Sequence, residues 1–191
     1  MNLGFVTTSR ADFGIYLPLL KKLKSSRDFN YFLFAGGMHT SKKFGYSYKL
    51  IEQEGFHLSG KLNTLVEEDS AFGISVSMGN TINAFAKIWN KFRNDLDLII
   101  VLGDRFEMFA AATAAIPFNI PIAHFHGGEI TLGAIDNKFR NAITEISDHH
   151  FVATPESKLR VEQMVESRKN VYHVGALGID TILETQFYTE E

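Results

Sequence analysis

The chain has 191 residues, of which 45% are hydrophobic and 21% are charged, and its formal net charge is −3 at pH 7. This length is enough for one well-packed globular domain and short for two. The slightly acidic charge excludes the basic surface that is typical of nucleic-acid-binding proteins. The sequence contains no cysteine, which excludes disulfides, thiolate metal sites and cysteine nucleophiles.

The N-terminal residues run directly into a strand-like pattern without the charged and apolar regions of a signal peptide. No sequence window reaches the apolar length of a membrane helix. We therefore expect a cytoplasmic protein without a membrane or a nucleic acid as partner.

Short apolar runs alternate with segments of helical periodicity along the whole chain. In chain order, the predicted strands are residues 3–8, 31–35, 56–62, 98–102, 121–125, 150–153 and 171–174. The predicted helices are residues 12–25, 46–54, 70–92, 107–116, 136–146 and 156–165. This alternation is typical of βαβ units, and it predicts a doubly wound, mainly parallel, seven-stranded Rossmann-like α/β sheet.

The fourth predicted strand, residues 98–102, is apolar on both faces and ends abruptly in Gly103-Asp104-Arg105. A strand of this kind belongs in the middle of a parallel sheet that helices cover on both sides. We expect one domain over residues 1–177. Residues 178–191 begin as a helix and then leave this pattern.

The loops that follow the strands of such a sheet meet at one edge, where ligands bind. Several acids, arginines, histidines and glycines fall in these loops, more than helix capping requires. They are Ser9, Arg10, His39, Gly103, Asp104, Arg105, His126, Gly127, Gly128, Glu129, Asp136 and Arg140.

These residues suit polar chemistry. Arg10 can hold a phosphate together with the amides of the first helix, although an exposed loop arginine explains it equally well. Asp104, Glu129 and Asp136 can act as general acid and base if their surroundings separate their pKa values, and capping a helix is the simpler role for an aspartate in such a place. Asp136 and Arg140 lie four residues apart on one helical face, which predicts an ion pair between them.

His124 and His126 share one face of the fifth strand, a spacing that can bind zinc with Glu129 or Asp104 as a third ligand. A hydrogen-bonded histidine at a strand end is the more common arrangement, and we predict no metal. His149 and His150 are expected in a turn at the opposite edge of the sheet. Neither a G-x-G-x-x-G nor a G-x-x-x-x-G-K motif follows a strand, so we expect no dinucleotide or other cofactor.

Four motifs resemble one known family in order and spacing. They are Thr8-Ser9-Arg10-Ala11-Asp12, Gly103-Asp104-Arg105-Phe106-Glu107, His124-Phe125-His126-Gly127-Gly128-Glu129 and Ile135-Asp136-Asn137-Lys138-Phe139-Arg140. The chain resembles the N-terminal half of the hydrolysing UDP-N-acetylglucosamine 2-epimerases, especially the branch that feeds sialic acid synthesis.

The resemblance implies a glycosyltransferase-B-like enzyme with two Rossmann-like domains and the UDP-sugar in the cleft between them. The implied reaction eliminates UDP across C1 and C2 and then adds water to the glycal, which gives N-acetylmannosamine. Asp104 and an acid of the following loop would handle the C2 proton and the water, with Asp136 as a further acid or base that Arg140 orients. Arg10 and Arg105 would contact the UDP-sugar.

Two departures from this family matter. Many relatives have glutamate at the position of His126, so either His126 or Glu129 can inherit the proton-transfer role. Relatives are also about twice as long, and their second domain supplies a catalytic histidine and most contacts to UDP. We therefore expect residues 178–191 to start the crossover into an absent C-terminal domain, and the isolated chain to be inactive.

Three other functions fit the sequence. We expect a homodimer if the chain belongs to an enzyme. The first is the same chemistry on a UDP-2,4-diacetamido-2,4,6-trideoxy sugar of the legionaminic acid route. A glycosyltransferase domain is the second, although a transferase commonly needs one base rather than three acids. The third is a non-catalytic domain that remains after loss of the second half.

Overall fold

The computed structural model describes residues 1–133 and 135–184, and its centre is a seven-stranded sheet in which every strand pair is parallel. The strands are β1 (Asn2–Thr7), β2 (Asn30–Ala35), β3 (Gly60–Lys61), β4 (Leu98–Leu102), β5 (Ile122–Phe125), β6 (His149–Val152) and β7 (Val171–His173). Their order across the sheet is β3-β2-β1-β4-β5-β6-β7. The predicted doubly wound α/β sheet of seven strands is confirmed.

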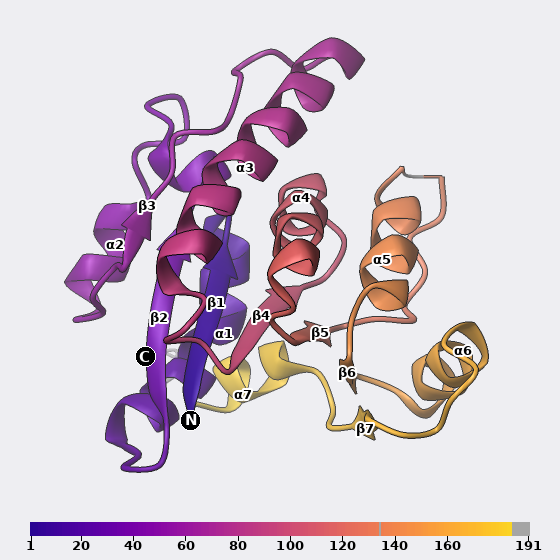
Figure 1. The fold of residues 1–191 in the computed structure, drawn as a ribbon. Coiled ribbons are helices and arrows are strands. Elements are labelled where there is room, and N and C mark those ends of the chain that lie inside the picture. Colours follow the sequence, from indigo (N-terminus) through magenta and orange to yellow (C-terminus); the bar gives the residue numbers. More distant parts are fainter. Residues whose placement is uncertain (134, 185–191) are drawn as a thin grey trace, which may run out of the picture.

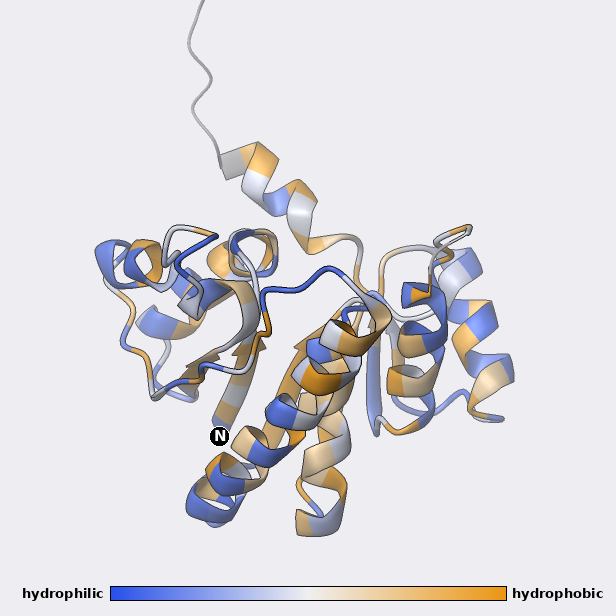
Figure 2. Ribbon diagram, turned by 90° about the horizontal axis from the view of Figure 1, so that it is seen from above, coloured by the Kyte–Doolittle hydropathy of each residue, from blue (hydrophilic) through white to orange (hydrophobic). Residues whose placement is uncertain are grey.

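Helices connect successive strands and cover the sheet. They are α1 (Arg10–Ser25), α2 (Tyr48–Gln53), α3 (Ala71–Phe92), α4 (Phe106–Ala115), α5 (Asp136–Glu145), α6 (Pro155–Met164) and α7 (Leu177–Glu184), with short 3₁₀ turns η1 (Gly37–Thr40) and η2 (Ile116–Phe118). In Figure 1, α3, α4 and α5 stand side by side in front of the sheet, and α3 packs on α4 and α4 on α5. Helix α7, which leads into the grey trace in Figure 2, lies on the other side of the sheet.

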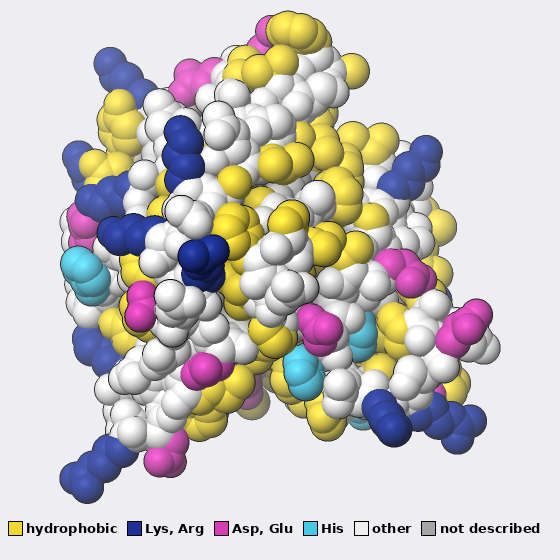
Figure 3. All heavy atoms as spheres, in the orientation of Figure 1, with side chains coloured by type: hydrophobic (Ala, Val, Ile, Leu, Met, Phe, Trp, Pro, Cys, Tyr) yellow, Lys and Arg dark blue, Asp and Glu magenta, His cyan; other side chains and the backbone are white. Residues whose placement is uncertain are grey.

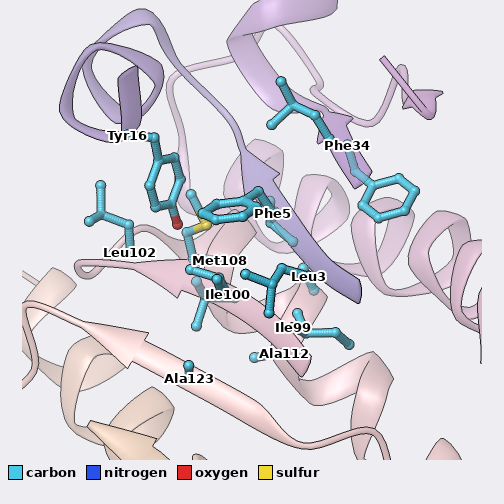
Figure 4. Packing of buried hydrophobic residues seen from close by; sticks show 14 of the residues in the cluster. Leu3, Phe5, Tyr16, Phe34, Ile99, Ile100, Leu102, Met108, Ala112 and Ala123 are labelled. Carbon is cyan, nitrogen blue, oxygen red and sulfur yellow. The ribbon is translucent and has the colours of Figure 1, made fainter. Parts of the chain in front are cut away.

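The core is built from aromatic and β-branched side chains of the central strands. Phe5 of β1 meets Tyr16 of α1 edge to face, with ring centroids 5.2 Å apart (Figure 4). Trp89 of α3 is fully buried, and its indole Nε1 donates a hydrogen bond of 3.0 Å to the carbonyl oxygen of Ala111. Burying such side chains stabilises the domain by roughly 1.5–3 kcal/mol each, which holds the strand ends in fixed positions.

One face of the sheet under β4 to β7 is less well covered by the residues that the structure describes. Phe125, Phe151 and Tyr172 stack across three neighbouring strands there, and Tyr172 is 45% exposed. They line an apolar hollow of about 520 Å³ together with residues of β1, α1 and β4.

Helix α7 packs on α1, and the hydroxyl of Thr181 donates to the carbonyl oxygen of Gly14 over 3.1 Å. The start of the predicted crossover segment therefore contacts the domain itself. Residues 185–191 lie outside the described part of the chain, and the crossover stays a prediction.

Two details of the sheet differ from expectation. The third strand was predicted over residues 56–62 but contains only Gly60–Lys61, because this edge strand pairs with β2 alone and only at its end. The predicted helix-to-strand turn ends before His149, because β6 starts at His149, one residue earlier than the predicted strand 150–153. His150 is buried and lies level with His124 on the neighbouring strand.

Candidate functional site

The carboxyl ends of β4 and β5 bring two candidate segments together. Leu102 is in register with Phe125, and the amide of Gly103 donates to the carbonyl oxygen of Phe125 over 2.9 Å. The turn that carries Asp104 therefore lies beside the loop that starts at His126. The parallel register of β4 and β5 thus puts both polar loops at the same edge of the sheet, as expected from the sequence.

The loop after β1 is a tightly closed helix start. Ser9 is the N-cap of α1 and accepts a hydrogen bond from the amide of Asp12, while the Asp12 carboxylate accepts from the amides of Thr8 and Ser9. This reciprocal arrangement is a capping box. Ser9 and Asp12 are buried by it, whereas the side chain of Arg10 remains exposed.

Asp104 and Arg140 form an ion pair between the β4 turn and α5. The guanidinium Nη2 of Arg140 donates to Oδ2 of Asp104, and the Thr131 hydroxyl donates to the same oxygen over 3.2 Å. A second nitrogen of Arg140 donates to that hydroxyl over 3.1 Å. The Arg140 side chain is 7% exposed, so its charge depends on this partner.

The predicted ion pair between Asp136 and Arg140 is wrong. Arg140 pairs instead with Asp104, 36 residues earlier in the chain. Asp136 occupies the first turn of α5, where the helix dipole favours a carboxylate, and its side chain is partly exposed. Asp136 is thus an acid of the first helical turn. It also lies on the rim, which is the edge of the sheet formed by the loops that follow the strands.

His126 and Glu129 form a second pair at the end of β5. Nδ1 of His126 donates to Oε1 of Glu129 over 2.6 Å, and this hydrogen bond lowers the pKa of Glu129. His126 has a backbone φ of +64°, a left-handed conformation that costs energy for any residue other than glycine. The side chain that contacts Glu129 thus starts from a strained backbone position.

His124 lies fully buried behind these pairs. Its Nε2 bonds the carbonyl oxygen of Gly103 over 2.8 Å, and its Nδ1 contacts the hydroxyl of Thr144 over 3.2 Å. Burial lowers its pKa to about 3, so the ring is neutral. Among the described residues, no group of three or more histidines, acids or cysteines is placed to hold a metal ion.

The glycines of the two loops serve different geometric needs. Gly103 has φ +73° in open space, so it supplies only the left-handed conformation of the turn. Gly128 has φ +76°, and a Cβ there would lie 2.5 Å from the carbonyl oxygen of Ser157. A Cβ on Gly127 would lie 3.0 Å from both His124 Nδ1 and Thr144 Oγ1.

The two other candidate residues, His39 and Arg105, differ in how deeply they are buried. His39 is fully buried, with Nε2 bonded to Thr7 Oγ1 and Nδ1 to Ser47 Oγ over 2.9 Å each, and burial lowers its pKa to about 4. Arg105 is 28% exposed and donates to Oε1 of Glu107 over 2.9 Å. Arg105 also lines a cleft of about 380 Å³ beside residues 65–69.

Three residues of this site, Thr131, Thr144 and Glu107, were not among the predicted catalytic or substrate-binding residues, although Glu107 belongs to one of the four motifs. Thr131 and Thr144 are neutral hydroxyls whose role depends on long-range contacts, to Asp104 in one case and to His124 in the other. The side chain of Glu107 is 1% exposed, and its Oε2 has no hydrogen-bond partner among the described residues. Burial raises the pKa of Glu107, although the positive charge of Arg105 acts in the opposite direction. The only sequence signal for Glu107 was its position two residues after Arg105, at the start of the predicted helix.

The described helices contain none that is long and apolar enough to cross a membrane. The fold and the rim of paired acids and bases define a Rossmann-like domain with a polar site at the carboxyl edge of its sheet. Sequence comparison assigns residues 21–191 to a family, and the chain belongs to the UDP-N-acetylglucosamine 2-epimerase family.

The similar proteins are consistent with this assignment. The chain is 34% identical over 187 residues to the UDP-N,N'-diacetylbacillosamine 2-epimerase (hydrolyzing) of Legionella pneumophila. The match covers 98% of the chain and 49% of that protein. It is 36% identical to the polysialic acid biosynthesis protein P7 of Escherichia coli over 94% of the chain and 45% of that protein. The chain thus spans about half the length of the curated relatives it matches.

Solved structures show the same fold. The UDP-GlcNAc 2-epimerase of Neisseria meningitidis, solved with UDP-GlcNAc bound, matches 96% of the chain and 49% of its own length with a TM-score of 0.82 at 20% sequence identity. The glycosyltransferase-B-like architecture predicted from the motifs agrees with this likeness.

Proposed function

We propose that the chain is the acid-and-base-bearing half of a hydrolysing 2-epimerase that converts UDP-N-acetylglucosamine to N-acetylmannosamine and UDP. In the first step a base takes the proton from C2 of the sugar, a C1–C2 double bond forms, and the C1–oxygen bond to UDP breaks. In the second step water adds its hydroxyl to C1 of the glycal, and C2 receives a proton on the opposite face.

The observation that carries this proposal is the close placement of two separate acid–base pairs at adjacent strand ends. Asp104 is held by Arg140, and His126 is held by Glu129. Elimination followed by hydration needs groups that can accept and return protons near one carbon atom. Asp104, the pair of His126 and Glu129, and Asp136 supply such groups, with Arg140 orienting Asp104.

Substrate binding uses the cationic and glycine-rich parts of the rim. The exposed Arg10 and the partly exposed Arg105 suit the diphosphate, because a guanidinium matches phosphate oxygens. Gly103, Gly127 and Gly128 would contact the sugar through their backbone, and of the three only Gly103 has open space where a Cβ would lie. Ser9 and His39 support this surface without reaching the substrate. The hydroxyl of Ser9 caps α1, and both ring nitrogens of His39 form hydrogen bonds within the domain.

We further propose that turnover needs a second domain. The chain spans about half the length of its relatives, and the side chains of Asp104 and Glu129 are 23% and 35% exposed. An open rim leaves the acids hydrated and the sugar unoriented, which weakens both proton transfer and positioning. We therefore expect the 191-residue chain to bind a UDP-sugar weakly and to turn it over negligibly.

A second substrate is favoured by the names of two relatives. The similar proteins of Legionella pneumophila and Campylobacter jejuni are described as 2-epimerases of N,N'-diacetylbacillosamine nucleotides, which are 2,4-diacetamido-2,4,6-trideoxy sugars. Parallel binding measurements with both UDP-sugars discriminate between the two substrates.

A homodimer is also proposed, with α3 as its contact helix. Hydrophobic side chains run in a band over α3 and α4 in Figure 3. Phe72 of α3 is 70% exposed.

The test follows UDP-N-acetylglucosamine with the purified chain by proton NMR in heavy water. Broadened ligand lines without product are the expected result, and Asp104→Asn should narrow them. Glu145→Gln, an exposed acid on the same helix as Arg140, is the matched control and should leave the broadening unchanged. Release of UDP at a rate that Asp104→Asn abolishes would refute the need for a second domain, and the absence of any broadening would count against the proposed substrate.

A further inference from the structure

His124 connects three segments that the proposed reaction needs. Its Nε2 contacts the carbonyl oxygen of Gly103 in the turn after β4, over 2.8 Å. Its Nδ1 lies 3.2 Å from the hydroxyl of Thr144 on α5, and this hydroxyl shares its single proton between that ring nitrogen and the carbonyl oxygen of Arg140, 3.0 Å away. The third segment is the loop after β5, because a side chain on Gly127 would collide with both His124 and Thr144.

The contact to Gly103 fixes the orientation of one peptide unit. A carbonyl oxygen only accepts hydrogen bonds, so Nε2 of His124 carries the proton and Nδ1 is the acceptor of the neutral ring. The carbonyl and the amide N–H of a trans peptide point in opposite directions. With the Gly103 carbonyl directed at the imidazole, the N–H of Asp104 points away from it, and the Asp104 side chain starts from a fixed backbone.

We propose that His124 is a positioning residue for the site: its neutral imidazole holds the Gly103–Asp104 peptide against α5, so that the Asp104 carboxylate stays at the Arg140 guanidinium. The proposal rests on the proposed function only in calling this ion pair part of an active site. The hydrogen bonds themselves exist whatever the substrate.

Nothing else in the described structure duplicates this link. The amide of Gly103 donates to the carbonyl oxygen of Phe125, which holds the Leu102–Gly103 peptide but not the Gly103–Asp104 peptide that follows, and no atom lies within 4 Å of the position of a Cβ on Gly103. The Thr131 hydroxyl contacts Asp104 from the far side, through its carboxylate rather than its backbone. The imidazole is also confined, since His124 is fully buried and lies level with Val101 and His150 on the two neighbouring strands.

Two substitutions separate a positioning role from plain core packing. The amide nitrogen of glutamine falls near the position of Nε2, so His124→Gln can still donate to Gly103. The shorter asparagine places its amide near Nδ1, so His124→Asn keeps the contact to Thr144 and loses the one to Gly103. Val101→Ala is the control, because it removes buried methyl groups on the neighbouring strand without touching a hydrogen bond of the network.

The first measurement is NMR of the 191-residue chain without ligand. We expect His124 to be neutral with its proton on Nε2, and His124→Asn to move the Asp104 amide and the Arg140 guanidinium signals. His124→Gln and Val101→Ala should leave both signals near their wild-type positions. Unchanged signals in His124→Asn, or a proton found on Nδ1 of His124, would overturn the proposal.

The second measurement is the Kd for UDP-N-acetylglucosamine from ligand line broadening. His124→Asn should raise this Kd about tenfold, the equivalent of one lost hydrogen bond, and His124→Gln should restore most of the affinity. Equal affinities of the two variants would contradict the positioning role. If the wild-type chain binds no UDP-sugar, the proposed function fails, and the ligand-free signals alone decide the role of His124.

Discussion

Nδ1 of His126 donates a hydrogen bond of 2.6 Å to Oε1 of Glu129, so the carboxylate fixes the proton on Nδ1 and leaves Nε2 as the ring nitrogen available to other partners. No hydrogen bond to Nε2 of this ring occurs within the described part of the chain. His124, two residues earlier, has the opposite tautomer because its Nε2 faces a carbonyl oxygen. One strand end thus carries one histidine arranged as a base and another arranged as a structural donor.

Glu129→Gln should release the tautomer of His126. A glutamine side chain can either accept a hydrogen bond from Nδ1–H through its oxygen or donate one to Nδ1 through its nitrogen, so it no longer selects one tautomer. We expect the ring nitrogen shifts of His126 to move from the Nδ1–H form toward a mixture of both tautomers, with those of His124 unchanged. Asp136→Asn alters a nearby acid that has no hydrogen bond to His126 and serves as control; an effect of equal size there would argue against the pairing.

Removing either partner of the Asp104–Arg140 ion pair should be costly. Arg140→Met leaves the Asp104 carboxylate, which is 23% exposed, with only the Thr131 hydroxyl as a donor, and we expect a loss of about 3 kcal/mol in the free energy of unfolding. Asp104→Asn leaves the guanidinium of Arg140, which is 7% exposed, without a counter-charge, so we expect a loss of about 3 kcal/mol or more. Urea unfolding gives both values.

The double variant decides whether the two residues are coupled. If they interact as the structure shows, Asp104→Asn combined with Arg140→Met should lose less stability than the sum of the single losses. Additive losses would mean that the ion pair contributes nothing.

Three glycine-to-alanine substitutions should have graded effects on stability. Gly128→Ala adds a Cβ 2.5 Å from a carbonyl oxygen at φ +76°, and Gly103→Ala adds one in open space at φ +73°. We expect losses of roughly 3 kcal/mol or more for Gly128→Ala and about 1 kcal/mol for Gly103→Ala. Gly14→Ala, inside α1 with open space around it, should stabilise by roughly 0.5–1 kcal/mol. Equal losses at Gly103 and Gly128 would contradict the close contact with Ser157.

Acid should destabilise the domain through its buried histidines. The pKa of His39 is lowered to about 4 and that of His124 to about 3 by burial, whereas an unfolded histidine titrates near 6.5. Between about pH 6.5 and 4 the unfolded chain therefore binds more protons than the folded one, and stability falls as the pH falls. Each histidine contributes a slope of about 1.4 kcal/mol per pH unit in this window.

Urea unfolding between pH 4.5 and 7 measures this slope. Burial lowers the pKa of His150 as well, so His124→Gln removes one of three such histidines, and its slope should be smaller than that of the wild-type chain by about 1.4 kcal/mol per pH unit. An identical slope in this variant would show that His124 is protonated in the folded state or that it is exposed.

Local sequence pattern was sufficient for the fold, as β4 illustrates. Residues 98–102 were predicted and observed as a strand, because an apolar run bounded by polar residues and Gly103 leaves few alternatives. The third strand was predicted too long, since the pairing of an edge strand depends on its neighbour rather than on its own residues.

Long-range partners limited the prediction of the site. The sequence placed Asp104 and Arg140 on one rim but paired Arg140 with Asp136, four residues away, because helical spacing is the only proximity that a sequence displays directly. The burial of His39 was equally inaccessible, since it depends on Ser47 and Thr7 closing around the ring.

The order of the strands has a consequence for how the chain acquires its structure. β1 is made first, yet it lies in the middle of the sheet between β2 and β4. Leu3 pairs with Leu98, so the central strand has only one neighbour until almost 100 residues have been synthesised. Pairing over such a distance slows folding and leaves apolar edges exposed in the meantime. During translation, a nascent chain that ends before β4 therefore leaves one edge of β1 open, although residues 3–7 of this strand are buried in the complete sheet.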